Sequence, residues 1–143
     1  MRFRMELFVK DVRASARFYS EVLGFVSGEE SDDYMSVRNW DASIGLGAIE
    51  NLPDGHYLKP QSEQERKGGG VEIVLEVEAI EAYYRSIMEL GYAIHGALAR
   101  RPWGATDFRI VDPDGYYIRL TEKNNGLFLE RLKEKGVFLR KKG

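Results

Sequence analysis

Charged side chains that recur inside strand-like segments are the residues of this sequence best suited to chemistry. Alternation of charged and apolar residues places the charged ones on one face of a strand. The charged residues that we single out are Arg4, Glu6, Glu72, Arg109 and Arg119. A guanidinium binds a carboxylate or phosphate through two parallel hydrogen bonds, and a carboxylate can bind a metal or neutralise an arginine. These residues could therefore anchor an anionic ligand, or they could pair with one another in a closed cluster.

Other common chemistries find little support in the sequence. The chain has no cysteine, which excludes disulfides, thiolate metal sites and cysteine nucleophiles. His56 lies in a linker and His95 in a predicted strand, and neither has a matching carboxylate partner that would indicate acid–base catalysis. Gly45-Leu46-Gly47 lacks the third glycine of a dinucleotide loop, and the chain contains no nucleophile elbow or phosphate loop motif.

An internal repeat supplies the elements that must position these residues. Residues 3–9 alternate as a half-buried strand, and the following helix is predicted to begin after Asp11 and to end at Gly24. Residues 71–77 alternate in the same way, and the next predicted helix ends at Gly91. Because the same order of elements returns, the sequence contains two copies of one module.

Each copy continues with three further strands. The segments 33–37 and 43–46 lie 74 residues ahead of 107–111 and 117–120, and the remaining strands are expected from Phe25 to about Glu30 and from Tyr92 to Ala99. The predicted fold is α+β, with two tandem βαβββ modules in one domain over residues 1–122. Its parts are module one at about 3–50, a linker at 51–70 rich in glycine, proline and charge, and module two at 71–122. Residues 123–143 form a C-terminal extension, expected as a short helix and a basic tail.

Three short motifs make this repeat more specific. They are Phe18-Tyr19, Leu23-Gly24-Phe25 and Asp112-Pro113-Asp114-Gly115. With the two modules, they make residues 3–122 resemble the vicinal oxygen chelate superfamily, which contains glyoxalases, bleomycin-resistance proteins and dioxygenases. The resemblance implies two sheets that curl into an open, barrel-like cleft. It also implies that one inward-facing residue on the first and last strand of each module can bind a divalent metal.

The four metal-ligand positions that the resemblance implies hold Arg4, Gly45, Glu72 and Arg119. Arginine has no lone pair to donate and glycine has no side chain, so one carboxylate is left for a cation that needs several donors. We therefore expect no metal and no other cofactor. Catalysis that depends on a metal as Lewis acid becomes the weaker interpretation, and ligand binding is favoured.

The loop from Pro102 to Phe108 resembles the corresponding loop of the bleomycin-resistance group. That likeness implies a metal-free homodimer with aromatic rings in the walls of its cleft. Trp40, Trp103, Phe108 and Tyr117 are candidate wall residues, although large rings belong more often to a core or a dimer interface. The full set of expected ligand-binding residues is Arg4, Glu6, Glu72, Trp103, Phe108, Arg109, Tyr117 and Arg119.

Charge and composition limit the partners of the protein. A formal net charge of -2, with basic residues spread along the chain, gives no general attraction to nucleic acid. The first residues lack the apolar segment of a signal peptide, and no apolar run approaches membrane-spanning length. We expect a cytoplasmic protein without nucleic-acid or membrane partners. Its ligand would be a small, antibiotic-like, aromatic or anionic molecule, bound without metal in the cleft between the modules.

Two alternatives stay open at this point. One is a metal-dependent lyase or dioxygenase-type enzyme with a displaced metal site, which could use Glu6, Glu72 and His95. The other is a non-catalytic structural or regulatory dimer whose cleft is plugged by ion pairs among Arg4, Glu72 and Arg119.

Overall fold

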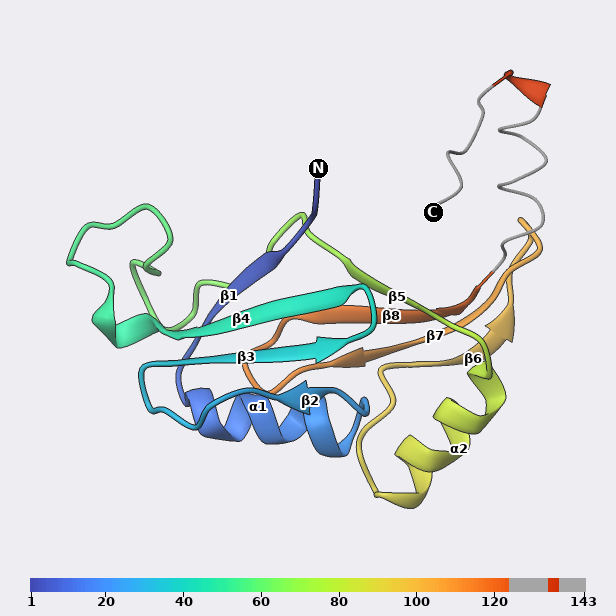
Figure 1. Cartoon of the computed structure of the whole chain (residues 1–143), viewed down its shortest axis with the longest axis horizontal. Helices are drawn as coiled ribbons and strands as arrows, with labels where there is room; N and C mark the ends of the chain where they lie inside the picture. Colours follow the sequence, from blue (N-terminus) through green and yellow to red (C-terminus); the bar gives the residue numbers. More distant parts are fainter. Residues whose placement is uncertain (124–133, 137–143) are drawn as a thin grey trace, which may run out of the picture.

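The computed structural model describes residues 1–123 and 134–136, which fold into two modules arranged along the longest axis of the molecule (Figure 1). The first module contains β1 (Met5–Val9), α1 (Val12–Glu21), β2 (Val26–Ser27), β3 (Tyr34–Asn39) and β4 (Ala42–Ala48). A short 3-10 helix, η1 (Ile49–Asn51), begins the connection between the modules. The second module contains β5 (Ile73–Val77), α2 (Ile80–Glu89), β6 (Gly96–Arg100), β7 (Thr106–Val111) and β8 (Tyr117–Glu122).

Local chemistry sets the ends of the helices. α1 begins where Asp11 Oδ1 accepts a hydrogen bond from the backbone N–H of Ala14 at 2.9 Å, because a capping side chain satisfies a donor that the first turn leaves free. After each helix the chain turns at a glycine with φ of 74°, Gly24 in the first module and Gly91 in the second. A residue with a Cβ would be strained in this conformation. The predicted helix ends and the internal repeat are therefore confirmed.

Each module forms its own four-stranded sheet. The strand orders are β1-β4-β3-β2 and β5-β8-β7-β6, and in each sheet the first strand of the module runs parallel to the last. The apolar faces build the core, whose fully buried members are Val9, Tyr19, Val37, Leu46, Ile87, Phe108, Ile110, Ile118 and Leu120. The predicted α+β fold of tandem βαβββ modules is confirmed, and over the described residues both sheets are open and no closed barrel forms.

Four strands are shorter than the sequence predicted, and one of them is β5, which begins at Ile73 instead of residue 71. β1 begins at Met5, and Phe3 lies before it with 77% of its surface exposed. β2 and β6 begin later than expected because the residues after each helix still bond back to it. The N–H of Phe25 donates to Tyr19 and that of Tyr92 donates to Ile87. These residues therefore close the end of a helix instead of extending a sheet.

Strand pairing fixes which positions of the two modules are equivalent. The predicted offset of 74 residues holds for the last strands, where Gly45 and Arg119 occupy the same register position. On the middle strands, Ser36 pairs with Gly45 and Arg109 pairs with Arg119, so the offset there is 73. Between equivalent register positions, the chain is one residue longer in the second module, where Ile110 pairs with Ile118, than in the first, where Val37 pairs with Ile44. The predicted alignment of the middle strands was wrong, and a one-residue shift exchanges the two faces of a strand.

The turn between β7 and β8 joins the two modules. It has the predicted turn form, with the N–H of Gly115 donating to the carbonyl of Asp112 at 3.0 Å. The Tyr19 hydroxyl donates to Asp112 Oδ2 at 3.0 Å, and the Tyr116 hydroxyl donates to the carbonyl of Phe8 at 2.9 Å. Burial raises the pKa of Asp112 above its usual range and raises the pKa of Tyr116 to about 12. The Asp-Pro-Asp-Gly motif thus forms a turn, and with Tyr116 it also forms the joint between the modules, meaning the hydrogen bonds that connect it to Tyr19 and Phe8.

Three further expectations concern the rest of the chain. The predicted linker, residues 51–70, consists of turns and bends after η1. No helix among residues 1–123 and 134–136 is long and apolar enough to cross a membrane. The expected C-terminal helix and basic tail fall mainly on residues 124–133 and 137–143, which lie outside the described residues.

Candidate ligand-binding site

In the first module, neighbouring side chains fill the last-strand metal-ligand position. Gly45 of β4 pairs with Glu6 of β1, and a Cβ added at Gly45 would collide with the Glu6 carboxylate and the Tyr34 hydroxyl. Glu6 Oε1 lies 2.9 Å from Arg4 Nε and accepts a hydrogen bond from the Tyr34 hydroxyl at 3.1 Å. Burial and the neighbouring carboxylate raise the pKa of Tyr34, which keeps its hydroxyl a donor. Arg4 was expected in a cluster with the second module, but it pairs within the first.

In the second module, the two metal-ligand positions form an ion pair. Arg119 Nε donates to Glu72 Oε1 at 2.7 Å, and Arg119 Nη1 lies 3.8 Å from Asp107 Oδ2. The only carboxylate among the four positions is therefore bound to a guanidinium. With the space at Gly45 also filled, these positions offer no set of free oxygen or nitrogen donors for a divalent cation. The residues present do not fit the metal that the resemblance implied.

The displaced metal site considered as an alternative is not assembled either. Across residues 1–123 and 134–136, no three His, Asp or Glu side chains gather as metal ligands, so Glu6, Glu72 and His95 do not form one site. The His95 ring instead lies edge-on to the Tyr117 ring, with centroids 5.5 Å apart. His95 also donates its backbone N–H to the carbonyl of Arg109 at 2.9 Å. This histidine is held by packing and by the sheet.

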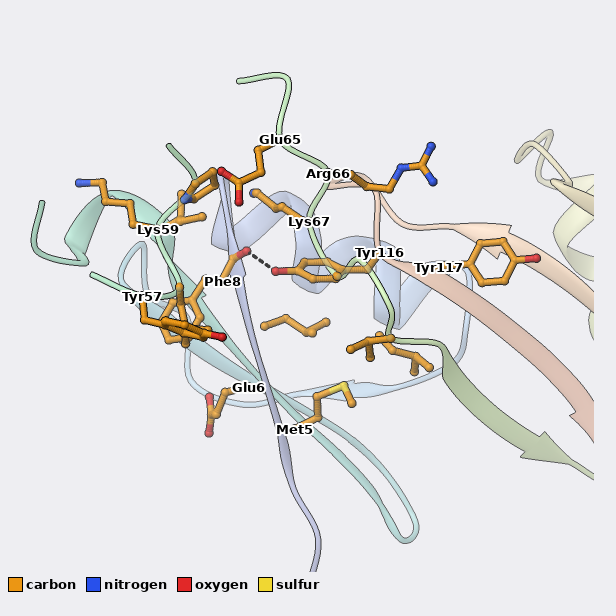
Figure 2. Close-up of a pocket in the computed structure, with 17 residues that line it drawn as sticks. Met5, Glu6, Phe8, Tyr57, Lys59, Glu65, Arg66, Lys67, Tyr116 and Tyr117 are labelled. Atoms are coloured by element: carbon orange, nitrogen blue, oxygen red, sulfur yellow. Dashed lines mark hydrogen bonds between the residues drawn. The ribbon is translucent and has the colours of Figure 1, made fainter. Parts of the chain in front are cut away.

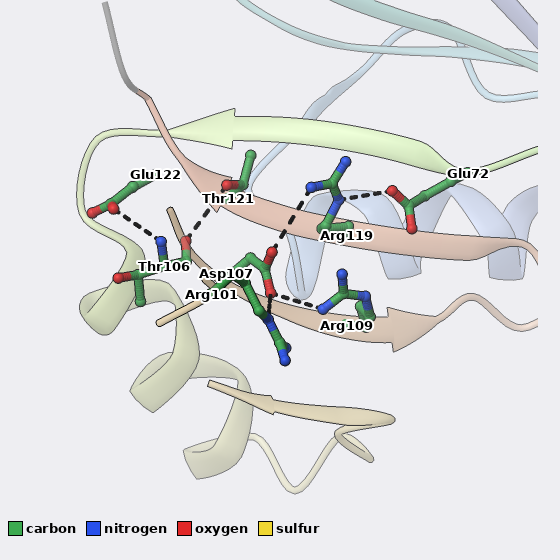
Figure 3. A network of polar contacts seen from close by, with 8 residues as sticks. All are labelled: Glu72, Arg101, Thr106, Asp107, Arg109, Arg119, Thr121 and Glu122. Atoms are coloured by element: carbon green, nitrogen blue, oxygen red, sulfur yellow. Dashed lines mark hydrogen bonds and ion pairs between the residues drawn. The ribbon is translucent and has the colours of Figure 1, made fainter. Parts of the chain in front are cut away.

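Each sheet has one face that packs on a helix and an opposite face, which we call the open face. The open face of the second sheet carries an arginine network, made of Glu72, Arg101, Asp107, Arg109 and Arg119 (Figure 3). Asp107 is fully buried, and its Oδ1 accepts hydrogen bonds from Arg101 Nε and Arg109 Nη1, each at 2.7 Å. Within the described residues, Asp107 Oδ2 has no hydrogen-bond partner. The three arginine side chains are 17–26% exposed, so they cover Asp107 while their outer edges still reach the surface.

Sequence reasoning missed Asp107 and misplaced its neighbour Phe108. Phe108 was expected in the cleft wall, but its side chain is fully buried and packs edge-on against Tyr84 of α2, with ring centroids 5.1 Å apart. Alternation along β7 contains the missing signal. Because Phe108 and Ile110 face the helix, Asp107 and Arg109 must share the opposite face. The one-residue error in the repeat alignment hid this arrangement.

A cavity of about 350 Å³ lies between the modules beside β1 (Figure 2). Strand β1, the linker and the start of β8 form its walls, and its aromatic lining residues are Phe8, Tyr57, Tyr116 and Tyr117. Of the expected site residues, Glu6 and Tyr117 line this cavity. Gly47 lets the Phe8 ring lie close to β4, since an added Cβ would stand 3.2 Å from the ring. The charged lining residues are Glu6, Lys59, Glu65, Arg66 and Lys67.

The two tryptophans lie away from this cavity. Trp103 is in the β6–β7 loop with 63% of its surface exposed. Trp40 forms the β3–β4 turn with φ of 49° and is 98% exposed, and it borders a wider depression of about 740 Å³ between that turn and β5. Neither ring contributes to the aromatic walls beside β1, where Tyr57 and Tyr116 were not anticipated.

Comparison with known proteins agrees with this architecture. The profile of the Glyoxalase/Bleomycin resistance protein/Dioxygenase superfamily matches residues 3–120. No curated protein matches the sequence. A virulence protein from Salmonella typhimurium is 22% identical, with 87% of this chain and 98% of that chain covered and a TM-score of 0.66.

Two further solved structures have different names but the same fold. Lactoylglutathione lyase from Agrobacterium tumefaciens is 16% identical, with 85% of this chain and 92% of that chain covered and a TM-score of 0.66. TioX from Micromonospora is 14% identical, with 85% and 98% covered and a TM-score of 0.68. At these identities the likeness shows the fold alone. Because the family profile spans most of its length, the chain belongs to the Glyoxalase/Bleomycin resistance protein/Dioxygenase superfamily.

Proposed function

We propose that this protein binds a small aromatic or anionic molecule without a metal, in the cleft between its modules, as a homodimer of the bleomycin-resistance-like kind. One observation carries the proposal. Both last-strand positions are closed to a cation, because Glu6 and Tyr34 occupy the space at Gly45 and an ion pair holds Arg119. A metal-dependent lyase or dioxygenase needs open donors at such positions.

The cavity beside β1 is suited to the body of the ligand. Its volume of about 350 Å³ lies within the range of small-molecule sites, and aromatic rings provide apolar, flat walls. Tyr117 connects this cavity with the arginine network, since it lies on the same face of β8 as Arg119 and two residues away, about 7 Å along the strand. A molecule with a ring and a negatively charged group could contact both regions.

A plugged cleft is the second candidate function, and the Glu72–Arg119 ion pair favours it. If that pair only fills space, the protein is a structural or regulatory dimer that binds no small molecule. The two candidates differ in one measurable property. A ligand that binds only the folded state must raise the free energy of unfolding, by about 2.7 kcal/mol at one hundred times its Kd.

A thermal-shift screen with aromatic acids and their neutral amides tests the proposal. We expect at least one compound to raise the melting temperature of the wild type, and Tyr117→Ala to reduce that shift. Trp40→Ala is the matched control, because Trp40 is exposed and lies outside the cavity beside β1. If no compound changes the melting temperature, the binding function is rejected and the plugged cleft is favoured. Light scattering tests the proposed homodimer.

A further inference from the structure

The arginine network contains a like-charged pair that stability alone does not explain. Arg109 of β7 and Arg119 of β8 are directly opposite each other in the sheet register. Side chains in such positions have Cβ atoms roughly 5 Å apart, and like charges placed there destabilise a sheet. Two arginines facing each other on an open face therefore need either a compensating anion or a role in binding one.

Asp107 compensates the pair only in part. Its Oδ1 accepts from Arg109 Nη1 at 2.7 Å, but Arg119 Nη1 stays 3.8 Å from its Oδ2, which is too long for a hydrogen bond. Asp107 Oδ2 is buried and has no hydrogen-bond partner among the described residues. Three arginines thus share two carboxylates in ion-pair contact, those of Asp107 and Glu72.

The network holds the Arg109 guanidinium in place but leaves some of its N–H donors without a partner among the described residues. A guanidinium has five N–H donors, and in the described part of the chain Arg109 uses Nη1 alone, which leaves its Nε and Nη2 edge without a partner. Gly96 of β6 pairs with Arg109, and a Cβ added there would stand 3.4 Å from the Arg109 side chain. The glycine therefore gives the stem of Arg109 room to lie across the sheet. Figure 3 shows Asp107 between Arg109 and Arg119, with Glu72 beside Arg119.

We propose that Arg109 and Arg119 form an oxyanion-binding site on the open face of the second sheet, with Asp107 positioning Arg109 and Glu72 positioning Arg119 through their hydrogen bonds. This inference rests on the proposed function and names the ligand class, a small molecule that carries a carboxylate or a phosphate. The flat edge of a guanidinium matches two oxygens of either group, and charge-assisted hydrogen bonds of this kind are strong. Binding an oxyanion would also relieve the repulsion between the two arginines.

Arginine Nε–H signals in nuclear magnetic resonance spectra test this site directly. The probes are benzoate, phenyl phosphate and benzamide, which share a ring and differ in their head group. We expect benzoate or phenyl phosphate to shift the signals of Arg109 and Arg119, and benzamide at the same concentration to leave them unchanged. The probe with the lower Kd identifies the preferred oxyanion. Equal shifts with benzamide would overturn the proposal, because they would show binding through the ring alone.

Three variants then test the residues. Arg109→Met should weaken binding of the preferred probe about tenfold or more, and Arg109→Lys should weaken it as well, because an ammonium keeps the charge without the planar fork. Arg13→Met is the matched control, since Arg13 forms exposed ion pairs with Glu30 and Asp32 on the first module. An unchanged Kd in both Arg109 variants would overturn the proposal.

The failure of this site is distinguishable from failure of the proposed function. If a compound raises the melting temperature and Tyr117→Ala reduces the shift, while both Arg109 variants bind the compound as the wild type does, the binding function stands and the oxyanion site is rejected. If neither the screen nor the three probes give binding to the wild type, both proposals are rejected. Folding of each variant is checked by its circular dichroism spectrum and its melting temperature.

Discussion

On the open face of β3 and β4 the first module presents Tyr34, Ser36 and Gly45, and at the same register positions of β7 and β8 the second module presents Asp107, Arg109 and Arg119. The first set is uncharged and supports the carboxylate of Glu6 above a glycine. The second set is charged and surrounds a buried carboxylate with guanidinium groups. Equivalent backbone positions thus carry different chemistry.

This difference shows on which face of each sheet the duplicated fold requires apolar residues and on which face it allows other residue types. The face that packs on the helix is apolar in both modules, because it builds the core. The open face does not have to be apolar, and its residues differ between the two modules. A ligand in the cleft would therefore meet an aromatic, glycine-lined surface on one side and an arginine-lined surface on the other, in place of two matching halves of a metal site.

Removing the buried carboxylate should have the largest effect on stability. Asp107→Asn takes away the charge that holds three guanidinium groups, and we expect a loss of roughly 3 kcal/mol in the free energy of unfolding. Tyr34→Phe at the equivalent position removes one hydrogen bond to Glu6 and should cost about 1 kcal/mol or less. Urea denaturation measures both values. Equal losses would mean that the two open faces do not differ as described.

Adding a methyl group at Gly45 or Gly47 of β4 should have a smaller effect on stability. In Gly45→Ala the new methyl group meets the Glu6 carboxylate and the Tyr34 hydroxyl, whose hydrogen bond must break, and we expect a loss of about 1 kcal/mol. Gly47→Ala should cost less, because the Phe8 ring at 3.2 Å has to move only slightly. Melting temperatures of the two variants give the order. A larger loss for Gly47→Ala would contradict the filled space at Gly45.

The joint between the modules offers a comparison that involves neither open face. Tyr116→Phe removes the hydrogen bond to the Phe8 carbonyl and should cost about 1 kcal/mol in denaturant unfolding. Tyr57→Phe is the matched control, because Tyr57 is 98% exposed, and it should cost nothing measurable. If both variants unfold at the same denaturant concentration, the Tyr116 contact does not stabilise the joint.

The smallest expected effect is a dependence on pH. Burial raises the pKa of Asp112 in the folded protein, so the unfolded chain loses this proton first as the pH rises above about 3.8. Over the window between that value and the raised pKa, ionisation of Asp112 lowers the free energy of unfolding as the pH increases. The stability of the wild type relative to Asp112→Asn should therefore fall across this window. A difference that stays constant or grows would contradict the raised pKa.

The sequence was sufficient to predict the modules, because strong local signals repeat in it. Asp11 caps a helix, and Gly24 and Gly91 end two of them, which are properties of a few neighbouring residues. The four metal-ligand positions followed from the same repeat together with the family resemblance. The register of the last strands, with Gly45 and Arg119 at one position, was also accessible in this way.

The candidate site was harder to predict from the sequence, because its geometry depends on contacts between segments that are distant in the chain. One extra residue between equivalent register positions of β7 and β8 changes which positions of β3 correspond to Asp107 and Phe108, and a simple count of repeat spacing does not detect it. The linker brings Tyr57 to the cavity although its composition predicts only turns. Arg4 pairs with Glu6 of its own module, and β1 and β5 lie in separate sheets, which the spacing of the repeat does not reveal.

We propose that ligands bind to this protein without a metal. The most direct measurement is a calorimetric titration of the preferred probe, benzoate or phenyl phosphate, into protein treated with a chelator, with bound metals measured by elemental analysis of the same sample. We predict the same Kd before and after treatment and no stoichiometric metal in either sample. Loss of binding on chelation, restored by adding a divalent cation, would show that binding depends on a metal.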